Sequence, residues 1–370
     1  MSISAGLVGL PNVGKSTLFN ALTQSSVPAE NYPFCTINPH LACTFVPDTR
    51  IGKLRELYQS KKELPGTVQF VDIAGLVKGA ASGEGLGNQF LSHIREVDLI
   101  LHVLRCFEDP NIANTQHEIN PVLDYEIIVT ELMLKDLESV TKRRAKVANL
   151  MKAAQQKPAE LKELTKEAEI LEQLEGALNA SNYQQVKRLG AELSTQKGLL
   201  LSTKNFLIIA NVAEHEIANN EYEKNKAYQQ LVSHFGQASV IPVCAKLEFE
   251  LSQLNEQDAT EMAQMMGLTQ RGLPTIIQQT YKNLGLITFF TCGPQEIHAW
   301  PIRQGITVRQ AAGEIHSDLE KGFICAEVFN CQDLFALKTE AKLRDSGKIR
   351  TEGNGYIVQD GDIVLIKFNV

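Results

Sequence analysis

Residues 9–16 read Gly-Leu-Pro-Asn-Val-Gly-Lys-Ser. This stretch matches the pattern GxxxxGK[ST]. An apolar, strand-like run over residues 3–8 precedes it, and a helix-like pattern over residues 16–23 follows it. A strand, a glycine-rich turn and a helix in this order predict a loop that wraps its backbone around a phosphate group. A merely structural tight turn would not need the Lys-Ser pair that closes the motif.

Each residue type in this loop has a chemical role in phosphate binding. Glycines let consecutive backbone N–H groups point at a β-phosphate, and the N-terminus of the following helix adds positive potential. Lys15 is placed to reach the β- and γ-phosphate oxygens, and the hydroxyl of Ser16 can bind Mg²⁺. The loop residues expected to hold the nucleotide phosphates are Asn12, Val13, Gly14, Lys15, Ser16 and Thr17.

A second motif supplies a carboxylate and a further glycine. Asp72 ends an apolar run and begins the pattern DxxG, which closes at Gly75. In nucleoside-triphosphate enzymes such a carboxylate holds Mg²⁺, and the glycine N–H senses the γ-phosphate. Thr36 lies between the two motifs and is a candidate Mg²⁺ ligand beside Ser16 and Asp72. The glycine-rich run 76–88 is either a segment that orders on a triphosphate or a passive flexible loop.

Three compositional regions divide the chain. Residues 1–134 alternate apolar runs with helix-like stretches, which is typical of an α/β fold with a parallel sheet and crossover helices. Residues 135–204 are rich in Lys, Glu, Ala, Gln and Leu at helical spacing, which predicts a helical hairpin or coiled coil. Strand patterns return over residues 205–284, so we expect the hairpin to be an insertion in one α/β domain. Residues 285–370 have short strand-like runs and tight turns, and we expect a separate small domain.

The charge pattern limits the partners that the protein can bind. The net charge is −7 and the isoelectric point is near 5.7, which disfavours a generally basic nucleic-acid binder and any DNA specificity. Lys and Arg nevertheless outnumber Asp and Glu in residues 135–204, where Lys142, Arg143, Arg144 and Lys146 form a basic cluster. This cluster is either a solvated helix face or an electrostatic contact with RNA or an acidic partner.

Membrane and extracellular classes are disfavoured. The apolar runs are too short to span a bilayer, and residues 1–9 lack the basic flank and cleavage site of a signal peptide. The seven cysteines are scattered and include no CxxC pair, which argues against a disulfide framework or a zinc ribbon. We therefore expect a soluble, cytoplasmic protein without membrane contact.

Longer stretches around the two motifs resemble a known family. LVGLPNVGKSTLFNALT (residues 7–23), YPFCTI (32–37) and DIAGLVKGAASGEGLGNQFL (72–91) are similar to the Obg branch of P-loop GTPases, and most of all to the YchF or Obg-like ATPase family. The resemblance implies a P-loop G domain with an inserted coiled-coil arm and a C-terminal TGS domain of β-grasp fold. It also implies slow, Mg²⁺-dependent ATP hydrolysis and binding to the ribosome or its RNA, with the large subunit as the expected site, in translation or stress regulation.

The base pocket departs from the guanine-selective pattern NKxD, whose Asp bonds guanine N1 and N2. Residues 211–214 read NVAE, so the Lys is absent and the acid is one methylene longer. A site built for one polar edge discriminates by roughly 10⁴ or more, and this change is expected to remove strong guanine preference. The resemblance implies that NxxE goes with ATP preference and that Asn211 faces the adenine edge. The expected base-contacting residues are Asn211, Val212, Glu214, Cys244, Ala245 and Lys246.

The hydrolytic machinery also departs from Ras-like enzymes, which orient the attacking water with a Gln directly after DxxG. Leu76 stands there, and because an apolar side chain cannot position water, we expect slow turnover. Asn12 resembles an asparagine that holds a monovalent cation in potassium-activated relatives, which makes potassium a candidate second cation. His117 is a candidate base, although Asn114 stands where family members often place a histidine. The expected catalytic residues are Lys15, Asn12, Thr36, Gly75 and His117.

Two other functions fit the same motifs. One is a GTPase of the Obg type, which a competition between ATP and GTP would distinguish. The other is a scaffold that binds the ribosome or RNA with little hydrolysis. The oligomeric state is open at this point.

Overall fold

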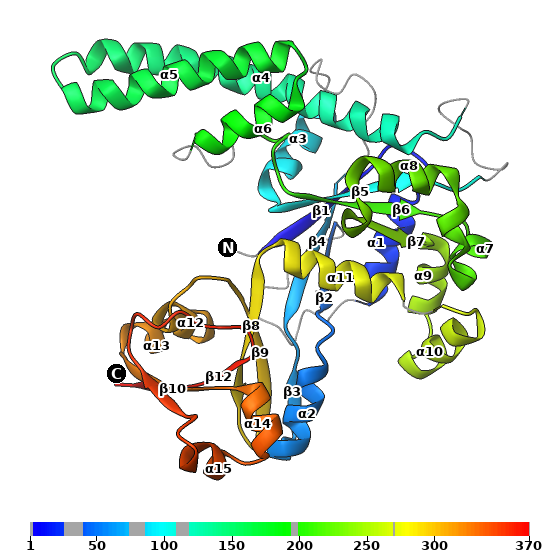
Figure 1. Ribbon diagram of the computed structural model, residues 1–370, viewed down its shortest axis with the longest axis vertical. Coiled ribbons are helices and arrows are strands. Elements are labelled where there is room, and N and C mark those ends of the chain that lie inside the picture. Colours follow the sequence, from blue (N-terminus) through cyan, green and yellow to red (C-terminus); the bar gives the residue numbers. More distant parts are fainter. Residues whose placement is uncertain are drawn as a thin grey trace.

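The computed structural model describes residues 3–25, 40–73, 86–108, 118–193, 199–268 and 271–369. Figure 1 shows a first sheet in the middle of the molecule, a helical arm at one end of the long axis and a second sheet at the other. The α/β fold, the helical insertion and the C-terminal domain expected from the sequence are confirmed. Within these residues, no helix is both long and apolar enough to cross a membrane.

The first sheet has, in the described residues, the strand order β2-β4-β1-β5-β6-β7. Neighbouring strands are parallel except for β2 and β4, which are antiparallel. A parallel sheet covered on both faces needs apolar strands, and β5 is buried along its full length. The strands are β1 Ser4–Val8, β2 Leu41–Phe45, β4 Thr67–Asp72, β5 Leu99–Arg105, β6 Phe206–Asn211 and β7 Val240–Val243.

Helices cover both faces of this sheet. Leu18 of α1 and Ile276 of α11 pack into the core on one face, and Phe90 of α3 and Ile128 of α4 pack into the core on the other. The helices of this part, apart from α4, are α1 Lys15–Gln24, α3 Leu86–Glu96, α7 Glu214–Ile217, α8 Lys226–Phe235, α9 Ala245–Ser252, α10 Glu256–Met265 and α11 Gly272–Asn283, with 3₁₀ turns at Ala218–Lys224 and Gln237–Ser239.

The arm consists of α4 (Pro121–Ala153), α5 (Pro158–Asn179) and α6 (Tyr183–Glu192). The sequence predicts that the arm starts at residue 135, whereas α4 begins at Pro121, where the side chain of Asn120 caps it. The first part of α4 packs on the first sheet and the remainder packs on α5. The boundary between the P-loop domain and the arm therefore falls inside α4. The apolar side chains of α4 contact the first sheet and then α5, and their helical spacing continues without a break.

Ion pairs between α4 and α5 hold the arm together. Arg143 Nε lies 2.7 Å from Glu167 Oε1. Arg144 lies 3.1 Å from the carboxylate of Glu172 and also pairs with Glu175. Two members of the basic cluster recognised in the sequence are thus neutralised by the neighbouring helix.

The second sheet has, within the described residues, the order β11-β10-β12-β8-β9-β3. The last strand, β12, lies parallel to β8 in the middle of this sheet, and α12 packs on one face, as expected for a β-grasp domain. Its strands are β3 Lys62–Leu64, β8 Leu286–Cys292, β9 Glu296–Arg303, β10 Phe323–Asn330, β11 Arg350–Glu352 and β12 Asp362–Phe368. Its helices are α12 Val308–Ile315, α13 Ser317–Lys321, α14 Cys331–Leu337 and α15 Glu340–Asp345.

A segment from early in the chain also belongs to this second sheet. β3 pairs in parallel with β9, and α2 (Thr49–Tyr58) packs through Ile51 and Leu54 into one core with Phe290. The sequence predicts that all of residues 1–134 lie in the P-loop domain, and the structure corrects this prediction. Residues 62–64 are too few and too polar to show a strand period, and their partner strand lies far along the chain.

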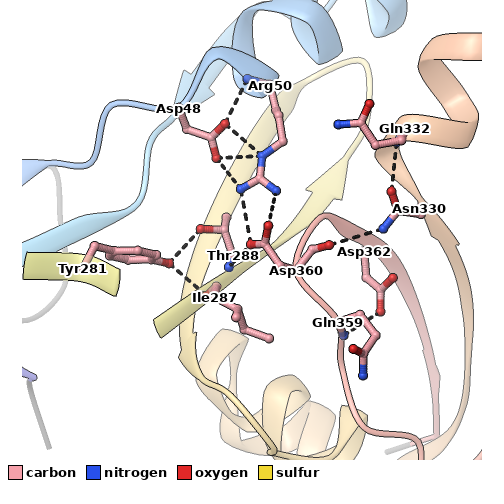
Figure 2. A network of polar contacts seen from close by, with 10 residues as sticks. All are labelled: Asp48, Arg50, Tyr281, Ile287, Thr288, Asn330, Gln332, Gln359, Asp360 and Asp362. Carbon is pink, nitrogen blue, oxygen red and sulfur yellow. Dashed lines mark hydrogen bonds and ion pairs between the residues drawn. The ribbon is translucent and has the colours of Figure 1, made fainter. Parts of the chain in front are cut away.

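A polar network joins this segment to the second sheet (Figure 2). The Arg50 guanidinium lies 2.7 Å from Asp48 Oδ2 and 2.7 Å from Asp360 Oδ2. Asp360 Oδ1 accepts a hydrogen bond of 2.9 Å from the backbone N–H of Thr288, whose hydroxyl lies 2.7 Å from that of Tyr281. Arg50 therefore ties the start of α2 to β8 and, through β8, to α11.

We expect Arg50→Ala to lower the free energy of unfolding by roughly 2 kcal/mol, because Asp48 and Asp360 lose their shared cation. The Arg50 side chain is 21% exposed, so solvent screening keeps the loss below that of a fully buried pair. Urea denaturation of the full chain measures it. Arg55→Ala, in the same helix, is the control: its contact with Glu63 is 3.7 Å long and half exposed, and its loss should stay within about 0.5 kcal/mol. Equal losses would contradict the assignment of Arg50.

A buried histidine lies in the middle of the first sheet. His102 of β5 is 2% exposed, and its Nδ1 has no hydrogen-bond partner among the described residues. The rings of Tyr125 and Phe206 lie 4.9 Å and 5.7 Å from it. Burial in this aromatic surrounding lowers the pKa of His102 to about 3.

His102 therefore predicts a pH dependence of stability. The unfolded histidine takes up a proton near pH 6.5, while the folded one stays neutral down to about pH 3. Stability is thus lost as the pH falls below 6.5, by up to about 1.4 kcal/mol per pH unit. His102→Phe, which suits the aromatic surroundings, should remove this one-proton slope from urea unfolding measured between about pH 7 and about pH 5. An unchanged slope would mean that His102 titrates normally.

Candidate functional site

The phosphate loop connects β1 to α1 in a tight turn. Gly14 caps α1 with a φ of 92°, and Asn12 has a φ of 64°. A Cβ on Gly14 would lie 2.2 Å from the amide nitrogen of Asn211, so only glycine fits at this position. A Cβ on Gly9 would lie 2.7 Å from the carbonyl oxygen of Val103. The loop is therefore curled closely against β5 and β6, and it ends at the N-terminus of α1.

Lys15 and Asp72 meet at the carboxyl edge of the first sheet. β1 and β4 are neighbours, and Leu7 is in register with Asp72. Lys15 Nζ forms an ion pair with Asp72 Oδ1, and Lys15 is only 8% exposed. The two sequence motifs, far apart along the chain, thus converge at the start of α1.

The oxygen atoms at this point suit magnesium. Ser16 is exposed and directly follows Lys15 in the first turn of α1. Its hydroxyl and the Asp72 carboxylate are hard donors of the kind that Mg²⁺ prefers, and Mg²⁺ usually adds waters and substrate phosphates to one or two protein ligands. In the described ranges, no three His, Cys, Asp or Glu side chains are grouped to hold a metal. The residues present therefore fit Mg²⁺ that binds together with a nucleotide.

Asn211, at the end of β6, connects the phosphate loop with the loop before α9. Its Nδ2 donates to the carbonyl oxygen of Val13 at 2.8 Å, and its Oδ1 accepts from the N–H of Ala245 at 2.9 Å. The side chain is 4% exposed, and its expected contact with the adenine edge stays a prediction. The strand order explains the two backbone bonds, because β6 lies between β5 and β7 and ends between the two loops.

The other predicted base-contacting residues surround this bridge. Val212, Cys244 and Ala245 are buried. The Glu214 carboxylate lies 3.1 Å from Lys246 Nζ, and this hydrogen bond raises the pKa of Lys246. Both of these side chains are exposed, so the pair lies at the rim of the cluster. The structure thus brings residues 211–214 and 244–246 together beside the phosphate loop.

Three predicted catalytic residues are not placed. Thr36, Gly75 and His117 lie outside the described residues, as do Leu76 and Asn114. Their assigned roles in Mg²⁺ binding, γ-phosphate sensing and proton transfer stay predictions.

Glu248 of α9 supports the site and was not identified from the sequence. It is 3% exposed, and its Oε1 accepts a hydrogen bond of 2.7 Å from the backbone N–H of Gly272 at the start of α11. Burial raises the pKa of Glu248. The contact fixes α9, whose first residue, Ala245, binds Asn211. No sequence signal could have linked Glu248 to Gly272, because neither residue belongs to a motif.

Comparisons with known proteins cover the full chain. The family described as "50S ribosome-binding GTPase" matches residues 4–134, and the YchF-GTPase_C family, described as "Protein of unknown function (DUF933)", matches residues 286–369. The protein "Ribosome-binding ATPase YchF" of Bacillus subtilis is 43% identical, and that of Escherichia coli O157:H7 is 42% identical, each over 100% of both chains.

A solved structure agrees with these matches. The YchF GTPase of Schizosaccharomyces pombe superimposes with a TM-score of 0.85 at 36% identity, over 99% of this chain and 98% of that one. The agreement extends over the P-loop domain, the arm and the β-grasp domain. The phosphate loop, the Lys15–Asp72 pair and full-length identities above 40% lead to one conclusion: the chain belongs to the YchF family of P-loop NTPases.

Proposed function

We propose that this protein is a Mg²⁺-dependent ATPase that hydrolyses ATP slowly and acts as a nucleotide switch on the ribosome, in translation or stress regulation. The observation that carries the proposal is the convergence of Lys15 and Asp72 at the N-terminus of α1. A buried lysine and a carboxylate at this point match the charges of a triphosphate and its metal ion. The name of the bacterial relatives, ribosome-binding ATPase, supports the same function.

The phosphate end of the site has defined tasks for its residues. When a nucleotide binds, Lys15 would exchange its contact with Asp72 for phosphate oxygens, and the N–H groups of Gly14 and its neighbours would donate to the β-phosphate. Ser16 and Asp72 would hold Mg²⁺, directly or through water, with Thr36 as the proposed third ligand. Bound Mg²⁺ neutralises charge that develops on the phosphate oxygens.

The base end supports a preference for ATP. A guanine site needs a carboxylate that accepts from N1 and N2 of the base. Here the acid is Glu214, and Lys246 already pairs with it at 3.1 Å. Guanine would compete with Lys246 for this carboxylate, whereas adenine has no N1–H donor that needs it. Leaving a polar partner unmatched is what makes such sites selective.

Slow turnover and the identity of the cations are parts of the same proposal. Leu76 cannot orient water, so Asn12, Gly75 and His117 are the residues that we propose to support hydrolysis, with potassium as a candidate second cation at Asn12.

The large ribosomal subunit is the proposed docking site, which the family description naming the 50S particle supports. That description also names a GTPase, so an Obg-type GTPase is the second candidate.

Nucleotide-free protein should bind ATP at least tenfold more tightly than GTP in a competition titration with Mg²⁺ and potassium present. The reason is the mismatch between the paired Glu214 and guanine. Lys15→Ala should weaken both nucleotides by a similar factor and serves as the control for the phosphate end. GTP binding equal to or tighter than ATP binding would favour the GTPase.

Asn211→Asp should weaken both ATP and GTP by roughly tenfold or more, because a carboxylate cannot donate to the Val13 carbonyl and would be repelled by it. Fluorescent-nucleotide titration measures both affinities. Asn283→Ala, at the exposed end of α11, is the matched control and should change neither. A loss confined to ATP would instead mean that Asn211 contacts the adenine.

A further inference from the structure

A polar cleft lies where the arm joins the P-loop domain. Figure 1 shows α3 beneath the middle of α4, and the space between these helices has a volume of about 520 Å³. Its lining comes from both helices and consists of Leu91, Ser92, Arg95, Lys135, Glu138, Ser139 and Lys142. It lies apart from the phosphate loop. Leu91 ends the stretch 72–91 and Lys142 belongs to the basic cluster, and the proposed function assigns no role to either residue.

The lining follows the helical period on both sides. On α4, Lys135, Ser139 and Lys142 recur at intervals of four and three residues and so share one face. On α3, Leu91 and Arg95 are one turn apart. α4 thus presents a polar stripe to this space, α3 contributes Ser92 and Arg95 beside the buried Leu91, and long basic side chains line the space from both helices.

The cleft has an excess of positive charge that its own residues do not neutralise. Lys135 Nζ pairs with Glu138 at 2.8 Å, which uses the only acid among the lining residues that the structure describes. Arg95 and Lys142 form no ion pair and donate no side-chain hydrogen bond to any residue that the structure describes. Lys135 and Lys142 both lie close enough to Glu138 to lower its pKa, after the hydrogen bond from Lys135. In the described lining, three cations therefore accompany one anion, and Arg95 also acts electrostatically on the buried Asp136 behind it.

The rest of the basic cluster behaves differently. Arg143 and Arg144, which directly follow Lys142, turn to the other side of α4 and pair with glutamates of α5. Their charges serve the arm itself. Lys142 and Arg95 instead line the cleft and are available to a ligand. Of the three consecutive residues 142–144, the first therefore faces the cleft and the other two stabilise the arm.

The walls of the cleft are held in a fixed relation. Asp136 of α4 is fully buried and accepts hydrogen bonds from the backbone N–H groups of Leu201 and Ser202 at 2.6 Å and 2.9 Å. Lys204, in the same connection, donates to the carbonyl oxygens of Arg95 and Val97 at the end of α3. The segment 199–204 thus ties α3 to α4, so the site is organised before any ligand arrives.

We propose that the α3–α4 cleft binds the phosphate backbone of RNA. Arg95 and Lys142 would bind phosphate oxygens from opposite walls, and the Ser92 hydroxyl can donate to the same or the next phosphate. The Ser139 hydroxyl already donates to the carbonyl oxygen of Lys135 at 3.1 Å. The volume exceeds that of a single phosphate group and suits a short run of backbone. This inference rests on the proposed ribosome binding, because it assigns the RNA contact to one site on the protein.

The test is RNA binding by the full chain. Fluorescence anisotropy of a short labelled RNA hairpin measures the affinity at a series of salt concentrations. The double variant Arg95→Gln/Lys142→Gln should bind roughly tenfold or more weakly at about 0.1 M salt, and its slope of log K against log salt should fall by about two. Arg144→Gln removes the same kind of charge from the paired side of α4 and should change the affinity by less than about twofold.

Conservative variants guard against misfolding. Arg95→Lys/Lys142→Arg keeps both charges and should bind RNA within about threefold of the original protein, with an unchanged salt slope. If Arg144→Gln weakens RNA binding as much as the double variant does, the loss reflects the overall charge of the protein and the cleft is not the site.

A competition experiment decides the class of ligand. Displacement of RNA by orthophosphate or by polyglutamate at equal charge concentration would overturn the assignment to RNA.

Ribosome co-sedimentation separates this inference from the proposed function. If the unchanged protein does not pellet with ribosomes, the proposed function fails. If it pellets and the double variant pellets equally well, the inference about the cleft fails alone. The expected result is pelleting of the unchanged protein and of Arg144→Gln, and a loss of several-fold for the double variant.

Discussion

The two sheets share one stretch of chain, and this continuity constrains the rest of the structure. After β2 the chain leaves the first sheet, contributes α2 and β3 to the second, and returns as β4. Arg50 closes this excursion by pairing with Asp48 before α2 and with Asp360 beside β8. Because β4 is hydrogen-bonded to β2 on one side and to β1 on the other, a change of register would cost both ladders.

The nucleotide site depends on that register. β4 starts next to the second sheet and ends at Asp72, which lies opposite Leu7 and pairs with Lys15. One strand therefore runs from the β-grasp domain to the phosphate loop, and its two ends cannot move independently without breaking pairs along it. On the other side of the sheet, the Asn211 amide closes the loop from behind, because it binds both Val13 and Ala245. The phosphate loop is thus held between two strands whose positions are set by different parts of the chain.

Local signals explain what could be predicted from the sequence. The phosphate loop, β1 and α1 form one continuous pattern, so the helix expected over residues 16–23 is found over Lys15–Gln24, with Gly14 as its N-cap. The membership of β3 in the second sheet could not be predicted, because Lys62–Leu64 has no apolar period and its partner Glu296–His298 is distant. The two bonds of Asn211 depend on strand order, which a motif does not encode. The start of α4 was missed because its apolar spacing continues unchanged from the sheet into the arm.

The basic residues of α4 show that composition alone does not tell which partner each charge has. Lys142, Arg143 and Arg144 are consecutive, yet a helix turns by about 100° at each residue, so neighbours along the chain face different surroundings. The rotation of α4 about its axis, fixed by burial of Val140 and Val147, directs Arg143 and Arg144 to α5 and Lys142 to α3. The same three charges therefore divide between stabilising the arm and facing an open cleft. A count of basic residues cannot make this division, since it depends on which apolar positions the helix buries.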